Sequence, residues 1–163
     1  MPARRARSLV GVAVVVTVAL AAGCGGGSDS EPPSPAEFRN EANAVCREAR
    51  TTLADITMPS SPDEFVTSLE MALPLQEELI DDLRDVDAPE ELTERYSDAL
   101  ALLSEQRSLG QQALDDIEGG GDPVAVITTL GPEIQRNEAR LDEVALELGL
   151  VDCAGGEPAA GSA

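Results

Sequence analysis

The sequence predicts an all-α protein: an up-down-up-down four-helix bundle. Four segments carry apolar residues at steps of three and four positions, which is the spacing of an amphipathic helix. Three of these segments begin with Ser-Pro or Asp-Pro, and a side-chain acceptor followed by proline is a strong helix start. The connections between the segments are only a few residues long, which makes neighbouring helices antiparallel.

The first two helices share one start signal. Ser34-Pro35-Ala36-Glu37 has the form of a capping box with proline at the first helical position, and Ser61-Pro62-Asp63-Glu64 repeats it. The first helix then carries apolar residues at Phe38, Ala42, Val45, Ala49, Leu53 and Ile56. The second carries them at Phe65, Leu69, Ala72, Leu73, Leu79, Ile80, Leu83 and Val86. Pro74 lies inside this second pattern, so a kink or a one-turn break is expected there.

The third and fourth helices meet at a glycine-rich turn. The third helix opens near Pro89 and stops at Gly119-Gly120-Gly121. Its apolar positions are Leu92, Tyr96, Ala99, Leu103, Ala113 and Ile117. Asp122-Pro123 then caps the fourth helix. The apolar positions of the fourth helix are Ile127, Leu130, Ile134, Leu141, Val144 and Leu148.

Glycines also shape the prediction for the course of the fourth helix. Gly131-Pro132 should break or bend its first third. Gly149 stands where a left-handed C-terminal cap belongs, and Leu150 can close the hydrophobic contact behind it. The β-rich run from Val124 to Thr129 lies too close to a helix cap and has no partner, so no strand is predicted.

Residues 1–23 read as an export signal. Three arginines lie within the first seven residues, and an uncharged run of about 14 residues, Leu9–Ala22, follows. This run is too short for a transmembrane helix, which needs roughly 20 residues. The small residues before Cys24 resemble the lipobox of bacterial lipoproteins. That resemblance implies a lipid-modified Cys24 as the first mature residue, on the extracytoplasmic face of the cell membrane; the alternative is a secreted protein with a chance cysteine.

The mature chain divides into three parts. Residues 24–33 read as a flexible linker, because after Cys24 they are all Gly, Ser, Pro or acidic residues. Residues 34–153 form the four-helix domain, and residues 154–163 are expected to be a disordered tail. With Cys24 assigned to lipid, Cys46 and Cys153 remain as a pair outside the cytoplasm, where a disulfide is expected. A redox-active or metal-binding pair is the alternative, and the absence of His and of a Cys-x-x-Cys motif disfavours it.

These cysteine motifs resemble a known group of proteins. The first helix contains Ala42-Asn43-Ala44-Val45-Cys46, and the domain ends with Leu148-Gly149-Leu150-Val151-Asp152-Cys153. Together they resemble small actinobacterial lipoproteins of uncharacterised function, in which an Ala-Asn-x-x-Cys helix is paired with a late Leu-Gly-x-x-x-Cys. The resemblance spans nearly the whole domain. It implies the helical fold and the disulfide, and it brings no activity with it.

Composition excludes several functions. Removal of residues 1–23 takes away three arginines and no acidic residue, which changes the formal net charge from −20 to −23. Such a charge repels nucleic acid, whose binding depends on cationic contacts to phosphate. The chain has no His, which excludes Ser-His-Asp and Cys-His catalysis and removes the usual ligand of zinc. We therefore expect no enzyme activity and no cofactor apart from the lipid on Cys24.

Three groups of polar residues are candidate sites. Two acidic clusters could attract calcium, although neither has the spacing of an EF-hand; they are Asp81, Asp82, Asp85 and Asp87, and Asp115, Asp116, Glu118 and Asp122. Gln76, Gln106 and Asn137 fall near core positions of three helices, with Gly110 leaving space beside Gln106. They would either line an internal pocket or pair across the bundle and fix its register. Tyr96 is expected to be packed with its hydroxyl satisfied.

The sequence thus favours a membrane-anchored lipoprotein without catalytic activity. Its domain is expected to be a protein-interaction or structural module of the cell envelope. Its expected partners are the outer leaflet of the cytoplasmic membrane and another envelope protein. The alternative is an extracytoplasmic binding protein for a small or cationic ligand such as calcium.

Overall fold

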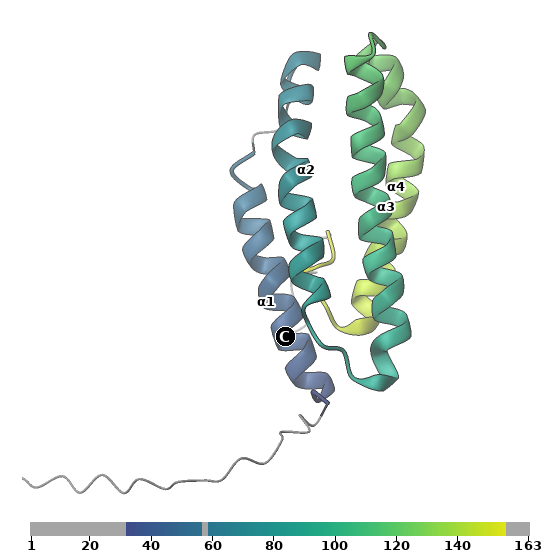
Figure 1. Cartoon of the computed structure of the whole chain (residues 1–163). Coiled ribbons are helices and arrows are strands. Elements are labelled where there is room, and N and C mark those ends of the chain that lie inside the picture. Colours follow the sequence, from purple (N-terminus) through teal and green to yellow (C-terminus); the bar gives the residue numbers. More distant parts are fainter. Residues whose placement is uncertain (1–31, 57–58, 156–163) are drawn as a thin grey trace, which may run out of the picture. The chain divides into compact units, whose positions relative to one another are not determined.

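Four antiparallel helices make up the part of the chain that the computed structural model describes, residues 32–56 and 59–155. They are α1 (Pro35–Leu53), α2 (Pro62–Arg84), α3 (Thr93–Glu118) and α4 (Pro123–Leu148). One 3-10 turn, η1 (Glu90–Leu92), precedes α3. Each helix packs against the next along the chain, so the predicted up-down-up-down four-helix bundle is confirmed (Figure 1). No strand occurs within the described ranges.

The three predicted N-caps are confirmed, but only one of the two predicted capping boxes forms. The N-caps of α1, α2 and α4 are Ser34, Ser61 and Asp122, and each side chain accepts a backbone hydrogen bond. In α1 the capping box is complete, because the Ser34 N–H also donates to Glu37 Oε2 at 2.9 Å. In α2 the matching carboxylate, Glu64, instead accepts from Ser60 N–H at 2.7 Å. Hydrogen bonds from the Ser34 hydroxyl and N–H hold the pKa of Glu37 below its ordinary value.

The structure contradicts a break at either internal proline, which was one of the two outcomes predicted at each site; the other outcome, a kink or bend, stays a prediction. Both α2 and α4 run without interruption through Pro74 and Pro132. A proline inside a helix leaves the carbonyl four residues earlier without its N–H partner. Here those carbonyls belong to Glu70 and Thr128, which are exposed residues, as are both prolines. Water can bond to the freed carbonyls, so the helices tolerate the prolines.

Some helix boundaries also differ from the prediction. α1 ends at Leu53, and Ile56 lies beyond it in a turn where its N–H donates to the Leu53 carbonyl. α2 ends at Arg84, and Val86 is buried just outside it. The apolar spacing continues past these ends because residues that follow a helix can still turn back onto the core.

The main hydrophobic core lies in the half of the bundle that all four helices share. Phe38 of α1 is fully buried there, and its ring meets the Tyr96 ring edge-on, with centroids 4.9 Å apart. The Tyr96 hydroxyl donates to the carbonyl of Leu83, so the predicted satisfied phenol is confirmed. Burial, and to a smaller extent the nearby charge of Glu41, raises the pKa of Tyr96.

α2 and α3 approach closely in the other half of the bundle. A Cβ atom at Gly110 would lie only 3.0 Å from Leu73 Cδ2. The space that Gly110 leaves is therefore filled by the Leu73 side chain, which is buried.

The predicted disulfide between Cys46 and Cys153 is confirmed. It joins α1 to the chain that follows α4, with the two Cα atoms 5.0 Å apart and 107 positions apart in sequence. Closing a loop of this size is worth at most about 4–5 kcal/mol in the chain-entropy model. The fold continues slightly past the bond, because Ala154 is buried and the Gly155 N–H donates to Asp142 Oδ1 at 2.7 Å. Residues 154 and 155, which were predicted to belong to the tail, are therefore part of the folded domain.

Removal of the disulfide should destabilise the domain without changing its fold. We expect the Cys46→Ala, Cys153→Ala double variant to lose about 2–4 kcal/mol of unfolding free energy, measured by urea denaturation. Wild-type protein unfolded in the presence of reductant should give the same midpoint as the variant. Mass spectrometry without reductant should show the two cysteine peptides joined, and two free thiols would contradict the assignment.

The single tyrosine provides an optical test of the core. Its pKa is raised in the folded state, so its contribution to stability is complete below the unfolded value of about 10 and is lost as the pH rises above it. We expect tyrosinate absorbance to appear above that pH only as the bundle unfolds, whereas in denaturant it titrates near pH 10. Tyr96→Phe should remove the signal and lower the unfolding free energy by about 1 kcal/mol. Titration near pH 10 in the folded protein would rule out this packing.

Candidate functional site

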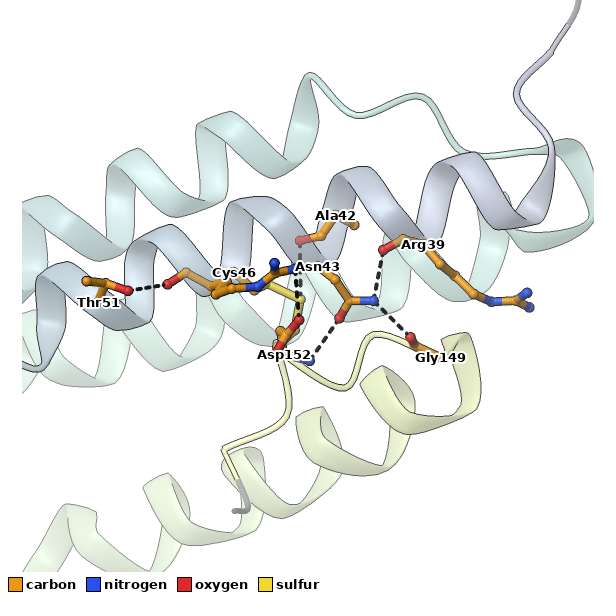
Figure 2. A network of polar contacts seen from close by, with 9 residues as sticks. Arg39, Ala42, Asn43, Cys46, Thr51, Gly149 and Asp152 are labelled. Carbon is orange, nitrogen blue, oxygen red and sulfur yellow. Dashed lines mark hydrogen bonds and ion pairs between the residues drawn. A yellow bond between two sulfur atoms is a disulfide. The ribbon is translucent and has the colours of Figure 1, made fainter. Parts of the chain in front are cut away.

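The C-terminal end of the domain is fastened to α1 by a set of side-chain contacts, here named the clasp. Asn43 is its centre: Nδ2 donates to the carbonyls of Arg39 at 2.8 Å and of Gly149 at 3.1 Å (Figure 2). Its Oδ1 accepts the N–H of Asp152 at 2.8 Å. Arg39 Nε donates to the carbonyl of Leu148 at 2.8 Å. These contacts satisfy backbone groups that the end of a helix otherwise leaves unpaired.

The clasp depends on the predicted left-handed cap at Gly149, which has φ +78°. The Leu150 N–H donates to the Ala145 carbonyl at 2.8 Å, and the Gly149 N–H donates to the Leu146 carbonyl at 3.0 Å. This pair of bonds defines a Schellman motif, and Leu150 is 2 % exposed as its hydrophobic contact. A Cβ at Gly149 would lie 2.9 Å from Arg39 Cδ and Nε. The glycine thus provides both the turn and the room for Arg39.

The two short cysteine motifs noted in the sequence meet in the clasp. Asn43 and Cys46 lie three residues apart and so share one face of α1. That face receives Gly149, Asp152 and Cys153 from the other motif (Figure 2). An exposed ion pair between Arg47 and Asp152, 3.2 Å apart, adds little to stability because solvent screens it. The role of Asn43 was not predicted, since only the fold brings its partners within reach.

A pocket of about 200 Å³ opens beside the clasp where α1 ends. We name it the amide pocket. All four helices and residues 153–155 line it. Its lining residues include Leu53, Gln76, Gln106, Asp142 and Gly155. A smaller cavity of about 60 Å³ shares Leu79, Leu103 and Leu141 with it and reaches inward to Tyr96. The two cavities adjoin and form the largely apolar interior space of the bundle.

Of the three predicted core amides, two line this pocket. Gln76 Oε1 and Gln106 Oε1 are buried, and neither accepts a hydrogen bond from any residue that the structure describes. Asn137 is 3 % exposed and does not line the pocket; its Nδ2 donates to the Leu102 carbonyl of α3 at 3.3 Å. No hydrogen bond joins any two of these three residues within the described ranges. The amides therefore do not pair with one another across the bundle.

The acidic clusters do not form a cation site in the part of the chain that the structure describes. Across residues 32–56 and 59–155, no group of three or more His, Cys, Asp or Glu side chains is placed to hold a metal ion. Asp81 pairs with Arg84 at 2.7 Å, and Asp115 Oδ1 accepts from Gln111 Nε2 at 2.8 Å. Asp122 is an N-cap, as predicted, with Oδ1 2.9 Å from Ala125 N.

The predicted lipidation site and signal peptide lie outside the described residues, so Cys24 stays a prediction. Among the helices that are described, none combines the length and the apolar character needed to cross a membrane.

Comparison of the chain with protein-family models, curated proteins and solved structures finds no match.

Alanine variants of two glycines separate the backbone role of Gly149 from its role in making room for Arg39. Gly149→Ala should lower the unfolding free energy by about 2–3 kcal/mol, because alanine is strained at positive φ and its Cβ displaces Arg39. The matched control is Gly120→Ala: Gly120 has φ +94° but nothing within 4 Å of the added Cβ. It should cost only about 1 kcal/mol. Equal losses for both variants in urea denaturation would show that the Arg39 contact adds nothing.

Proposed function

We propose that this protein is a membrane-anchored lipoprotein whose helical domain is a non-catalytic interaction or structural module of the cell envelope. The observation that carries this proposal is the disulfide between Cys46 and Cys153. Disulfides persist in oxidising compartments and are rare in the cytosol. The bond accounts for two of the three cysteines and leaves Cys24, the residue that follows the signal-like segment. The oxidising compartment that the disulfide favours and the availability of Cys24 for lipid both support the lipoprotein proposal.

The chemistry of the amide pocket supports a non-catalytic role. Gln76 and Gln106 carry amides, which near neutral pH act neither as general acids or bases nor as nucleophiles. Of the two carboxylates at the pocket, Asp142 accepts the Gly155 N–H and is engaged in fastening the chain end, and Glu138 belongs to an exposed residue. The chain also has no His to act as a general base. These groups are therefore better suited to binding than to catalysis.

A second candidate function is that of an extracytoplasmic binding protein for a small ligand. One observation favours it: the amide pocket joins apolar walls to two buried oxygen acceptors that no described residue satisfies. Ligand sites are commonly concave and apolar, with a few polar groups that fix orientation.

The lipid anchor is tested by replacing its attachment site. In a bacterium that matures lipoproteins, wild-type chain should incorporate a fatty-acid label and partition into detergent or membrane. Cys24→Ser should do neither, because a hydroxyl is not the substrate of the lipobox reaction. The control is the Cys46→Ala, Cys153→Ala double variant, which should keep its label. Label on the Cys24→Ser chain, or a wild-type chain without label, would refute the lipoprotein assignment.

A further inference from the structure

We infer that the amide pocket binds a small, uncharged or cationic amphiphile that donates hydrogen bonds to Gln76 and Gln106. This inference rests on the second candidate function, and it concerns the pocket alone. It does not depend on lipid at Cys24.

The pocket exists because α1 is the shortest helix. α1 has 19 residues, whereas α3 and α4 have 26 each. Leu53, the last residue of α1, lines both interior cavities. Beyond it no further turn of α1 covers the inner faces of α2, α3 and α4. The pocket is thus a consequence of the unequal helix lengths in the bundle.

The walls of the pocket select for an apolar body. Leu79, Ile80, Leu103 and Leu141 line it from α2, α3 and α4. An engineered apolar cavity of about 150 Å³ in another protein holds one benzene molecule. The volume of about 200 Å³ here therefore suits one six-membered ring with a short polar substituent.

The polar groups of the pocket select for a hydrogen-bond donor. Gln76 and Gln106 line the pocket from two helices, and their Oε1 atoms are buried without a partner among the described residues. A buried acceptor without a donor is unfavourable, so rotation of each amide about its last side-chain bond, toward a hydroxyl, amide or ammonium group held in the pocket, removes that penalty. Two acceptors from neighbouring helices can orient one donor group.

Charge selects against anions. Glu138 and Asp142 lie at the pocket with a single cation, Arg50. The formal net charge of the whole chain is −20. A carboxylate or phosphate ligand would meet this negative potential, whereas an alcohol or amine would not.

The test uses the mature chain with Cys24→Ser, so that no lipid competes for the pocket. Three ring compounds of similar size serve as probes: benzyl alcohol as the donor, toluene without a donor, and benzoate as an anion. Titrations are followed through backbone and glutamine side-chain amide signals by NMR. We expect saturable shifts at Gln76 and Gln106, with benzyl alcohol binding about threefold to tenfold more tightly than toluene. Benzoate should be the weakest.

Two variants identify the groups responsible. Gln106→Leu keeps the approximate size of the side chain but removes the acceptor, so it should abolish the preference for benzyl alcohol while toluene still binds. The matched control is Gln112→Leu on an exposed position of the same helix, which should leave both affinities unchanged. Thermal unfolding of each variant verifies that the bundle is intact.

Three outcomes would overturn the inference. Absence of saturable shifts with all three probes would mean that the pocket holds water only. An unchanged preference in Gln106→Leu would mean that the amides do not recognise the donor. Tightest binding of benzoate would mean that the charge argument is wrong. Each result is independent of fatty-acid labelling at Cys24, so failure of the pocket and failure of the lipid anchor are distinguishable.

Discussion

The bundle depends on the fastening of its first helix to the turn that ends its last helix. α1 packs along α2, but it makes few direct contacts with α4. Closure of the bundle instead runs through the segment after α4, which Asn43 and the disulfide hold against α1. Phe38 of α1 and Leu150 of the segment after α4 are both buried where the two are fastened together. The fastening thus helps to hold Phe38 against Tyr96 in the core.

The sequence predicts well those features that local chemistry determines. Helix starts at Ser34, Ser61 and Asp122 follow from side-chain acceptors and prolines that act within four residues. The disulfide was predicted from the expected compartment and from the two cysteines that remain once Cys24 is assigned to lipid. The sequence could not decide between a kink and a break at Pro74, because a proline is tolerated inside a helix where the carbonyl that it leaves unpaired can reach water, and exposure is a property of the folded chain. The exposure of Pro74, rather than its residue type, explains why α2 continues through it.

The candidate site was only partly predictable for the same reason. Amides at core positions of three helices indicated either a pocket or a polar pairing, and the sequence could not choose between them. The choice depends on the length of α1, which ends at Leu53 although the apolar spacing continues to Ile56. It also depends on Asn137, which turns to the Leu102 carbonyl and leaves Gln76 and Gln106 at the cavity. Long-range packing, which no local pattern encodes, determines both.

The position of the disulfide has a mechanical consequence. Cys46 and Cys153 lie 107 positions apart, so almost the whole bundle is enclosed between them. Tension applied between the two ends of the domain passes along α1 from Pro35 to Cys46 and then crosses the sulfur–sulfur bond. α2, α3 and α4 lie outside this load path. A domain joined in this way can be pulled at its ends without extending the helices that enclose its interior.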